Sequence, residues 1–168
     1  MSATQLIESA ALSTNPLDLA EQLIHERDWL CDRPADDELV AEFEGGWCNY
    51  RIWFNWQEDL GGMVFTCTYD MKVAPSMASR LHGLLAAINE RLWIGHFDLG
   101  SQDGVIMFRH GLLLSGGQGV NPDQLEDLID IGINECNRFY PAFQSVLWGG
   151  STVEQALTYA MIDTVGEA

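Results

Sequence analysis

The sequence predicts one α+β domain in which helices pack on an antiparallel sheet of five strands. Apolar residues recur at helical spacing in four segments, and aromatic or β-branched residues are concentrated in five others. The predicted order is α-β-β-β-α-β-β-α-α, in which strands follow one another as hairpins rather than as parallel βαβ units. The chain has 168 residues, 47% of them apolar, and is long enough to form one hydrophobic core.

The first helix is predicted over residues 16–28. Asn15 is a favourable N-cap residue, and Pro16 suits the first helical position. Apolar residues then recur at the spacing of one helical face. Residues 1–14 are rich in Ser, Thr and Ala and are expected to be disordered, so the single domain is expected to span residues 15–165.

Three strands are expected next. Alternating residues predict the first over 39–44, before Gly45-Gly46. The second, over 47–57, is rich in aromatic residues, which is typical of a strand with both faces partly covered. Gly61-Gly62 indicates a hairpin turn, after which residues 63–69 form the third strand.

The second half of the chain begins with a helix and a further hairpin. Pro75-Ser76 starts the helix, whose apolar residues form one continuous stripe up to Leu92. Residues 94–99 and 104–114 are expected to form two more strands, with a polar turn between them.

Two helices complete the predicted domain. Asn121-Pro122 repeats the Asn-Pro helix start, and Pro141 is expected to end or kink this helix. Ser151 to Glu154 fit a capping box, and residues 152–163 form the last helix. This helix either packs on the core or serves as a docking element, and the sequence leaves both alternatives open.

Charge excludes several classes of partner. The chain has 25 acidic and 8 basic residues, a net charge of −17, which repels phosphate and anionic lipid surfaces. We therefore expect neither nucleic-acid nor membrane binding. No apolar run approaches the roughly 18 residues of a membrane span, and the first residues lack the basic start of a secretory signal. A cytoplasmic location is expected.

The cysteines and histidines predict neither a metal nor a cofactor. The four cysteines are widely spaced without a C-x-x-C pair, and the four histidines lack the spacing of a zinc site. In a reducing compartment the cysteines are expected to remain thiols.

One pentapeptide resembles the signature of ABC-type ATPases, namely Leu114 to Gln118. The chain has no P-loop, and its only lysine is Lys72. A glycine-rich connection between a strand and a capped helix explains the pentapeptide more simply, so we expect it to be inert.

His96 and Asp98 are expected on the same strand face, where a carboxylate can orient a general base. Arg109 belongs to the next strand, and pairing with a nearby carboxylate is its default expectation. No companion nucleophile is evident, so we assign no catalytic residue and favour structural hydrogen bonds at these positions.

Six carboxylates lie between Asp32 and Glu44, against the single base Arg33. The pattern of a calcium loop is absent from this segment. A solvated face is favoured over a docking surface for a basic partner.

Several strings of residues resemble the proteobacterial YbjN-domain family over residues 15–165. The strings are Trp47-Cys48 with Tyr50, Ile88 to Asp98, Phe108 to His110, Asn137 to Gln144, and Trp148 to Gly150. The resemblance implies a regulator of sensory transduction, with no reaction, ligand or catalytic residue to carry over. It also implies a fold like that of type III secretion chaperones, which are small, acidic, dimeric proteins.

Two hypotheses for function follow. The first is a non-enzymatic protein-binding regulator or chaperone-like protein, which binds a polypeptide through apolar contacts, with a basic polypeptide as the candidate partner. The second is a small-ligand sensor or small enzyme that uses the neighbourhood of His96, Asp98 and Arg109. The candidate binding residues are Trp47, Tyr50, Trp53, Trp56, His96, Asp98 and Arg109.

A homodimer is also expected. Trp47 and Trp53 are expected on one face of strand 47–57, and most other aromatic residues of the strand on the opposite face. If helices cover only one side of the sheet, a second subunit is expected to cover the other.

Overall fold

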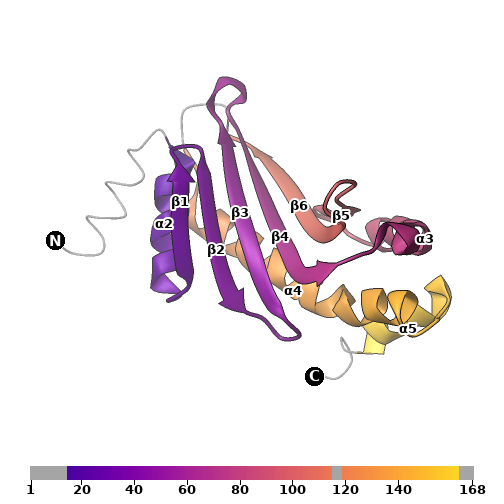
Figure 1. The fold of residues 1–168 in the computed structure, drawn as a ribbon. Helices are drawn as coiled ribbons and strands as arrows, with labels where there is room; N and C mark the ends of the chain where they lie inside the picture. Colours follow the sequence, from indigo (N-terminus) through magenta and orange to yellow (C-terminus); the bar gives the residue numbers. More distant parts are fainter. Residues whose placement is uncertain (1–14, 115–118, 163–168) are drawn as a thin grey trace.

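The computed structural model describes residues 15–114 and 119–162, which form a six-stranded antiparallel sheet and four α-helices (Figure 1). The strand order across the sheet is β1-β2-β3-β4-β6-β5. The strands are β1 (Leu30–Ala35), β2 (Glu38–Glu44), β3 (Asn49–Gln57), β4 (Gly62–Lys72), β5 (His96–Leu99) and β6 (Val105–Leu113). The helices are α2 (Pro16–Glu26), α3 (Ala78–Asn89), α4 (Pro122–Leu147) and α5 (Val153–Ile162).

The predicted α+β class with an antiparallel sheet is confirmed, but the sheet has six strands rather than five. The missed strand is β1, which pairs with β2 at the edge of the sheet. Its sequence lacks a clear alternation of apolar and polar residues, because Arg33 occupies a position that faces the helices, where an apolar residue is usual. Nη1 of Arg33 donates to Asp18 and Glu21 of α2 at 2.7 and 2.8 Å, so an ion pair replaces an apolar contact.

The core lies between one face of the sheet and the helices. In β3 and β4 every second side chain points to this core, and Phe54, Phe65 and Cys67 are fully buried. α2 and α4 lie behind the sheet in Figure 1, and α3 packs beside β5 and α4. The hydroxyl of Tyr69 donates to the carbonyl of Cys136 in α4 at 2.8 Å, so the sheet and the long helix are also joined by a buried hydrogen bond.

α4 does not end at Pro141, which was one of the two expectations for this residue, because the helix continues to Leu147. A proline lacks the N–H that would bond the carbonyl four residues earlier, here that of Asn137. The indole N–H of Trp47 donates to this carbonyl at 3.0 Å. The carbonyl that Pro141 leaves unpaired in the helix is therefore bonded from outside the helix, at an exposed position.

α5 begins with a capping box one residue later than predicted. The hydroxyl of Thr152 accepts from the N–H of Gln155, and the Gln155 side chain accepts from the N–H of Thr152. The helix packs on α4 and α3. It buries Ala156 and Ala160 completely, whereas Met161 is 53% exposed.

Both edges of the sheet are protected against further strand pairing. At β5, the side-chain amide of Asn89 bonds both the N–H and the carbonyl of Phe97, at 2.7 and 3.0 Å, and occupies the place of a neighbouring strand. At β1, Pro34 lies within a β-bulge between Asp32 and Ala35. Proline and bulges are features that block edge-to-edge association.

Some sequence predictions fall outside the described residues. They concern the expected disorder of residues 1–14 and the ABC-like pentapeptide, of which residues 115–118 are not described. Within the described part, no helix is long and apolar enough to cross a membrane.

Candidate functional site

The candidate functional site is the face of the sheet opposite the helices, which we call the open face. It is formed by the alternate side chains that do not enter the core. The strand register places these side chains in rows. One row runs across the whole sheet and consists of Asp32, Val40, Trp53, Thr66, Arg109 and His96.

The centre of the open face carries apolar and uncharged side chains. Trp53 lies next to Val40 on β2 and Thr66 on β4 in the same row. Val64 and Met107 lie in the flanking rows, and Leu113 is 81% exposed at the end of β6. Apart from Leu113, these residues are half-buried, and they lie on the face of the sheet that the described helices do not cover, so the centre is a partly exposed apolar surface.

The β1–β2 side of the open face is acidic. We call this side the acidic margin and define it as Asp32, Glu38, Glu42 and Glu44. Among the described residues, Glu42 alone in this margin has a cationic partner, because the guanidinium of Arg51 on β3 bonds it, with Nε at 2.6 Å from Oε1. The same guanidinium lies 6.0 Å from the ring of Trp53 and thus connects the margin to the apolar centre.

The opposite side of the open face holds the predicted group of His96, Asp98 and Arg109. His96 lies directly opposite Arg109 in the register, and Asp98 lies 3.9 Å from the guanidinium of Arg109. The expected shared face and ion pair are therefore present. Both charged side chains are about half exposed, and they lie on the surface of the sheet rather than in an enclosed cleft.

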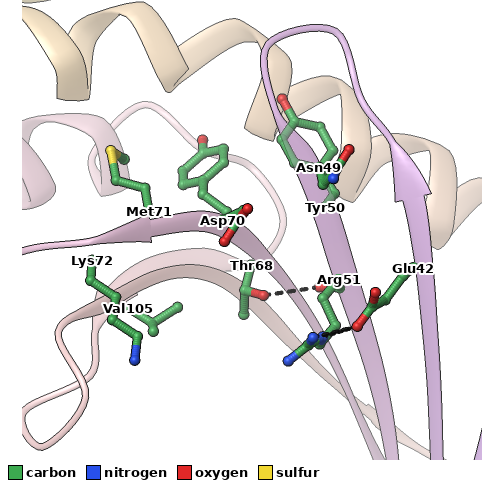
Figure 2. A pocket seen from close by; sticks show the side chains of 10 residues that line it. Glu42, Asn49, Tyr50, Arg51, Thr68, Asp70, Met71, Lys72 and Val105 are labelled. Carbon is green, nitrogen blue, oxygen red and sulfur yellow. Dashed lines mark hydrogen bonds and ion pairs between the residues drawn. The ribbon is translucent and has the colours of Figure 1, made fainter.

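A hollow of about 210 Å³ lies at one end of the open face, where β4 bends away from β6. Figure 2 shows Arg51, Thr68 and Lys72 on one side of the strands and Tyr50 and Met71 on the other. Glu42 and Asp70 also line the hollow, so its two bases are balanced by two carboxylates. This balance gives the hollow no preference for an anion or a cation.

The structure separates the seven candidate binding residues into two groups. Trp53, His96, Asp98 and Arg109 lie on the open face, as described above. Trp47, Tyr50 and Trp56 belong to the helix side, and the expectation that Trp47 shares a face with Trp53 is wrong.

Trp47 and Tyr50 each contact a residue of α4. Trp47 lies in the loop before β3 and stacks on Tyr140 of α4, with ring centroids 5.8 Å apart. Tyr50 is fully buried, and its hydroxyl donates to Oδ1 of Asn137 at 2.7 Å. Burial raises the pKa of Tyr50, which keeps this hydroxyl protonated as a donor.

The four cysteines of the described chain are buried or half-buried thiols. Cys136 is fully buried in the core. Burial is the main cause that raises the pKa of Cys31, Cys48 and Cys136, and a raised pKa disfavours the reactive thiolate. In the described residues, no three His, Cys, Asp or Glu side chains are arranged to hold a metal ion.

A second hollow, of about 390 Å³, lies between α3 and the β5–β6 turn. Its lining includes His82, Asp98 and Asp103 beside apolar residues. Neither His96 nor Arg109 lines it, so the predicted group of three does not meet in this hollow.

Comparison with known proteins identifies the family. Residues 16–145 match YbjN, described as "Putative bacterial sensory transduction regulator". The chain belongs to the YbjN family. Among solved structures, it is similar to the crystal structure of YbjN, "a putative transcription regulator from E. coli", at 20% identity and a TM-score of 0.46. The match covers 72% of this chain and 90% of that chain. No curated protein matches the sequence.

In this YbjN-family chain, the strand register identifies residues of the open face that the sequence patterns did not single out. Val64, Met107 and Arg51 are the main ones, because each lies beside Trp53 or one row away from it. The signal available in the sequence was the alternation of inward-facing and outward-facing side chains within each strand. It indicates which residues share a face of one strand, but not which residues of different strands are neighbours.

Proposed function

We propose that this YbjN-family protein is a non-enzymatic regulator that binds a polypeptide on the open face of its sheet. The observation that carries the proposal is the row of half-buried side chains around Trp53, which lies on the face of the sheet opposite the described helices. Soluble monomers rarely leave such a surface uncovered unless it binds another molecule. The family description, a sensory transduction regulator, agrees with a role in binding rather than catalysis.

The protected edges of the sheet also favour the open face as the binding surface. Asn89 occupies the hydrogen-bonding edge of β5, and Pro34 and its bulge interrupt that of β1. A polypeptide that pairs with the sheet as an extra strand finds no suitable edge. Association through the face remains, where side chains rather than backbone groups provide the contacts.

Two occupants are proposed for the open face. One is a second copy of the chain, which gives the expected homodimer when no partner is present. The other is the regulated partner, which competes with the second copy for the same apolar centre. In this scheme α5 belongs to the folded core, and its exposed Tyr159 and Met161 are not part of the binding surface.

The alternative function is a small-ligand sensor. The observation that favours it is the hollow of about 390 Å³ beside α3, whose size is within the range of small-molecule sites. Asp98 lines this hollow and also pairs with Arg109 on the open face.

A pair of matched variants tests the proposed function. Trp53→Asp introduces a charge in the apolar centre, whereas Trp93→Asp makes the same change at a side chain that is 79% exposed outside the open face. We expect affinity pull-downs followed by mass spectrometry to lose specific polypeptides with Trp53→Asp and to keep them with Trp93→Asp. Equal recovery with both folded variants, together with a metabolite that raises the melting temperature, would favour the sensor instead.

A further inference from the structure

We infer that the partner of the open face is a basic amphipathic helix, which lies with its cationic side chains along the acidic margin and its apolar side chains over β3, β4 and β6. This inference rests on the proposed function, because it names the chemistry of the occupant of the same surface. It follows from how charge, apolar surface and strand spacing are distributed over the open face.

Three of the four carboxylates of the acidic margin have no cationic partner in the described chain. Within the described chain, no Arg, Lys or His side chain lies within ion-pair distance of Asp32, Glu38 or Glu44. The nearby Arg33 points to the helix side of β1 and is engaged by Asp18 and Glu21. The margin therefore presents three carboxylates that a cationic ligand can neutralise without first displacing an internal partner.

The other half of the open face is electrically balanced. On β4, Asp70 and Lys72 lie two residues apart on the same face, and on β5 and β6 Asp98 pairs with Arg109. A partner consequently meets negative charge on one side only. This asymmetry fixes the orientation of the partner, because its cationic side chains are favoured at the acidic margin and its apolar side chains at the apolar centre.

The spacing of the strands fits a helix. Neighbouring strands are about 4.8 Å apart, so the margin on β2 is roughly 10 Å from the apolar residues of β4. An α-helix with its side chains has a diameter of about 10–12 Å and can contact both at once. Trp53 on β3 lies between these two strands, next to Val40 on β2, and both side chains would contact the apolar face of the helix.

A second copy of the chain suits the acidic margin less well. Each copy carries a net charge of −17 and brings its own margin to the interface. The charge therefore opposes self-association and favours a basic partner, although the apolar centre serves both. A partner with clustered Lys or Arg is expected to displace the second copy.

The test uses the full chain and a peptide probe of about 18 residues, built from Leu and Lys as an amphipathic helix, with Glu in place of Lys in the control peptide. The margin variant is Asp32→Asn with Glu38→Gln. The matched control is Asp127→Asn with Glu126→Gln, at exposed positions on α4. Both variants change the net charge by the same amount, so a difference between them reports position alone.

We expect the margin variant to bind the Leu/Lys peptide about tenfold more weakly, which is what about 0.7 kcal/mol for each of two ion pairs would give, and the control variant to bind like the wild type. The Leu/Glu peptide should not bind. A third variant, Val64→Asp, reports on the apolar centre and should abolish binding of the Leu/Lys peptide.

Two results separate the proposals. If the margin and control variants bind the peptide equally well while Val64→Asp abolishes binding, the open face is a binding surface, but the inference that the acidic margin selects a basic helix is overturned. If Val64→Asp also binds normally while it remains folded by circular dichroism, the open face itself is overturned, and the proposed function fails with it.

Discussion

The indole N–H of Trp47 donates to the main-chain carbonyl of Asn137 at 3.0 Å, across 90 residues of sequence. Pro141 explains why this carbonyl is available, since its ring removes the N–H that an α-helix would supply four residues later. The same indole stacks on Tyr140. The loop before β3 and the C-terminal half of α4 are thus joined at one point by a hydrogen bond and a ring contact.

Replacing Trp47 should reduce stability without affecting the open face. Trp47→Phe keeps an aromatic ring near Tyr140 but removes the donor, and we expect it to lower the free energy of unfolding by about 1–2 kcal/mol. Urea denaturation followed by circular dichroism measures this. In a Pro141→Ala background, where the helix can supply its own N–H, the same substitution should cost less. An equal cost in both backgrounds would contradict the role assigned to Trp47.

His110 should make the fold sensitive to acid. Burial, followed by the neighbouring His96, lowers the pKa of His110 below its ordinary value of 6.5. The folded state therefore binds fewer protons at this site than the unfolded state. Its contribution to stability is present above the unfolded pKa and is lost as the pH falls from there through the folded pKa.

The measurement is urea denaturation of the wild type and of His110→Gln at about pH 7.5 and pH 5. We expect the wild type to lose more stability than the variant between these two pH values. An identical loss in both proteins would mean that another group causes the acid sensitivity. His82→Gln, at an exposed position on α3, serves as the control for the removal of one imidazole.

Salt should distinguish the two occupants of the open face. A homodimer brings together two chains of charge −17, so raising salt from about 50 to 500 mM should screen their repulsion and strengthen the dimer. A basic partner is held by opposite charge, so the same change should slow its association.

Light scattering after gel filtration tests the dimer, with an expected mass of roughly twice 18.7 kDa. Trp53→Asp should shift the mass to that of a monomer, because Trp53 lies at the centre of the open face. A wild type that is monomeric at micromolar concentration and high salt would contradict the dimer. Binding of a partner to the open face would then be tested on the monomer.

Removing α5 should destabilise the protein. Truncation after Gly150 exposes the surfaces of α4 and α3 on which Ala156 and Ala160 are buried. Burial of apolar surface stabilises the fold in proportion to the area buried, and the truncation removes part of this buried area. We expect a lower melting temperature in differential scanning fluorimetry. An unchanged melting temperature with faster dissociation of a bound partner would instead assign α5 to docking.

The caps and the helical stripes were the most predictable features of the fold. Asn15 and Asn121 cap α2 and α4 as expected, because an Asn-Pro pair both supplies an acceptor and fixes the first helical turn. Gly61 adopts a positive φ of 58° at the β3–β4 turn, where the Gly-Gly pair indicated a hairpin. These signals are local, so neighbouring residues are sufficient to read them.

The features that escaped prediction depend on residues distant in sequence. β1 could not be recognised, because its inward-facing Arg33 is matched by Asp18 and Glu21 of another element. α4 continues past Pro141, and the carbonyl that this proline leaves unpaired accepts a hydrogen bond from Trp47, which is distant in sequence and belongs to no helical pattern. For the candidate site, alternation predicted that His96 and Asp98 share a face, but the row that joins Trp53 to Arg109 requires the register of three strands.

The amide of Asn89 at β5 and the interrupted edge at β1 also limit how large an assembly of this protein can become. Growth into a fibre requires each added molecule to offer a fresh, equivalent surface to the next one. Here the edges offer none, and we expect the open face to be used up once a single molecule covers it. A complex that forms through this face is then expected to close after one association step, so that concentration changes how much of it forms but not how many molecules it contains.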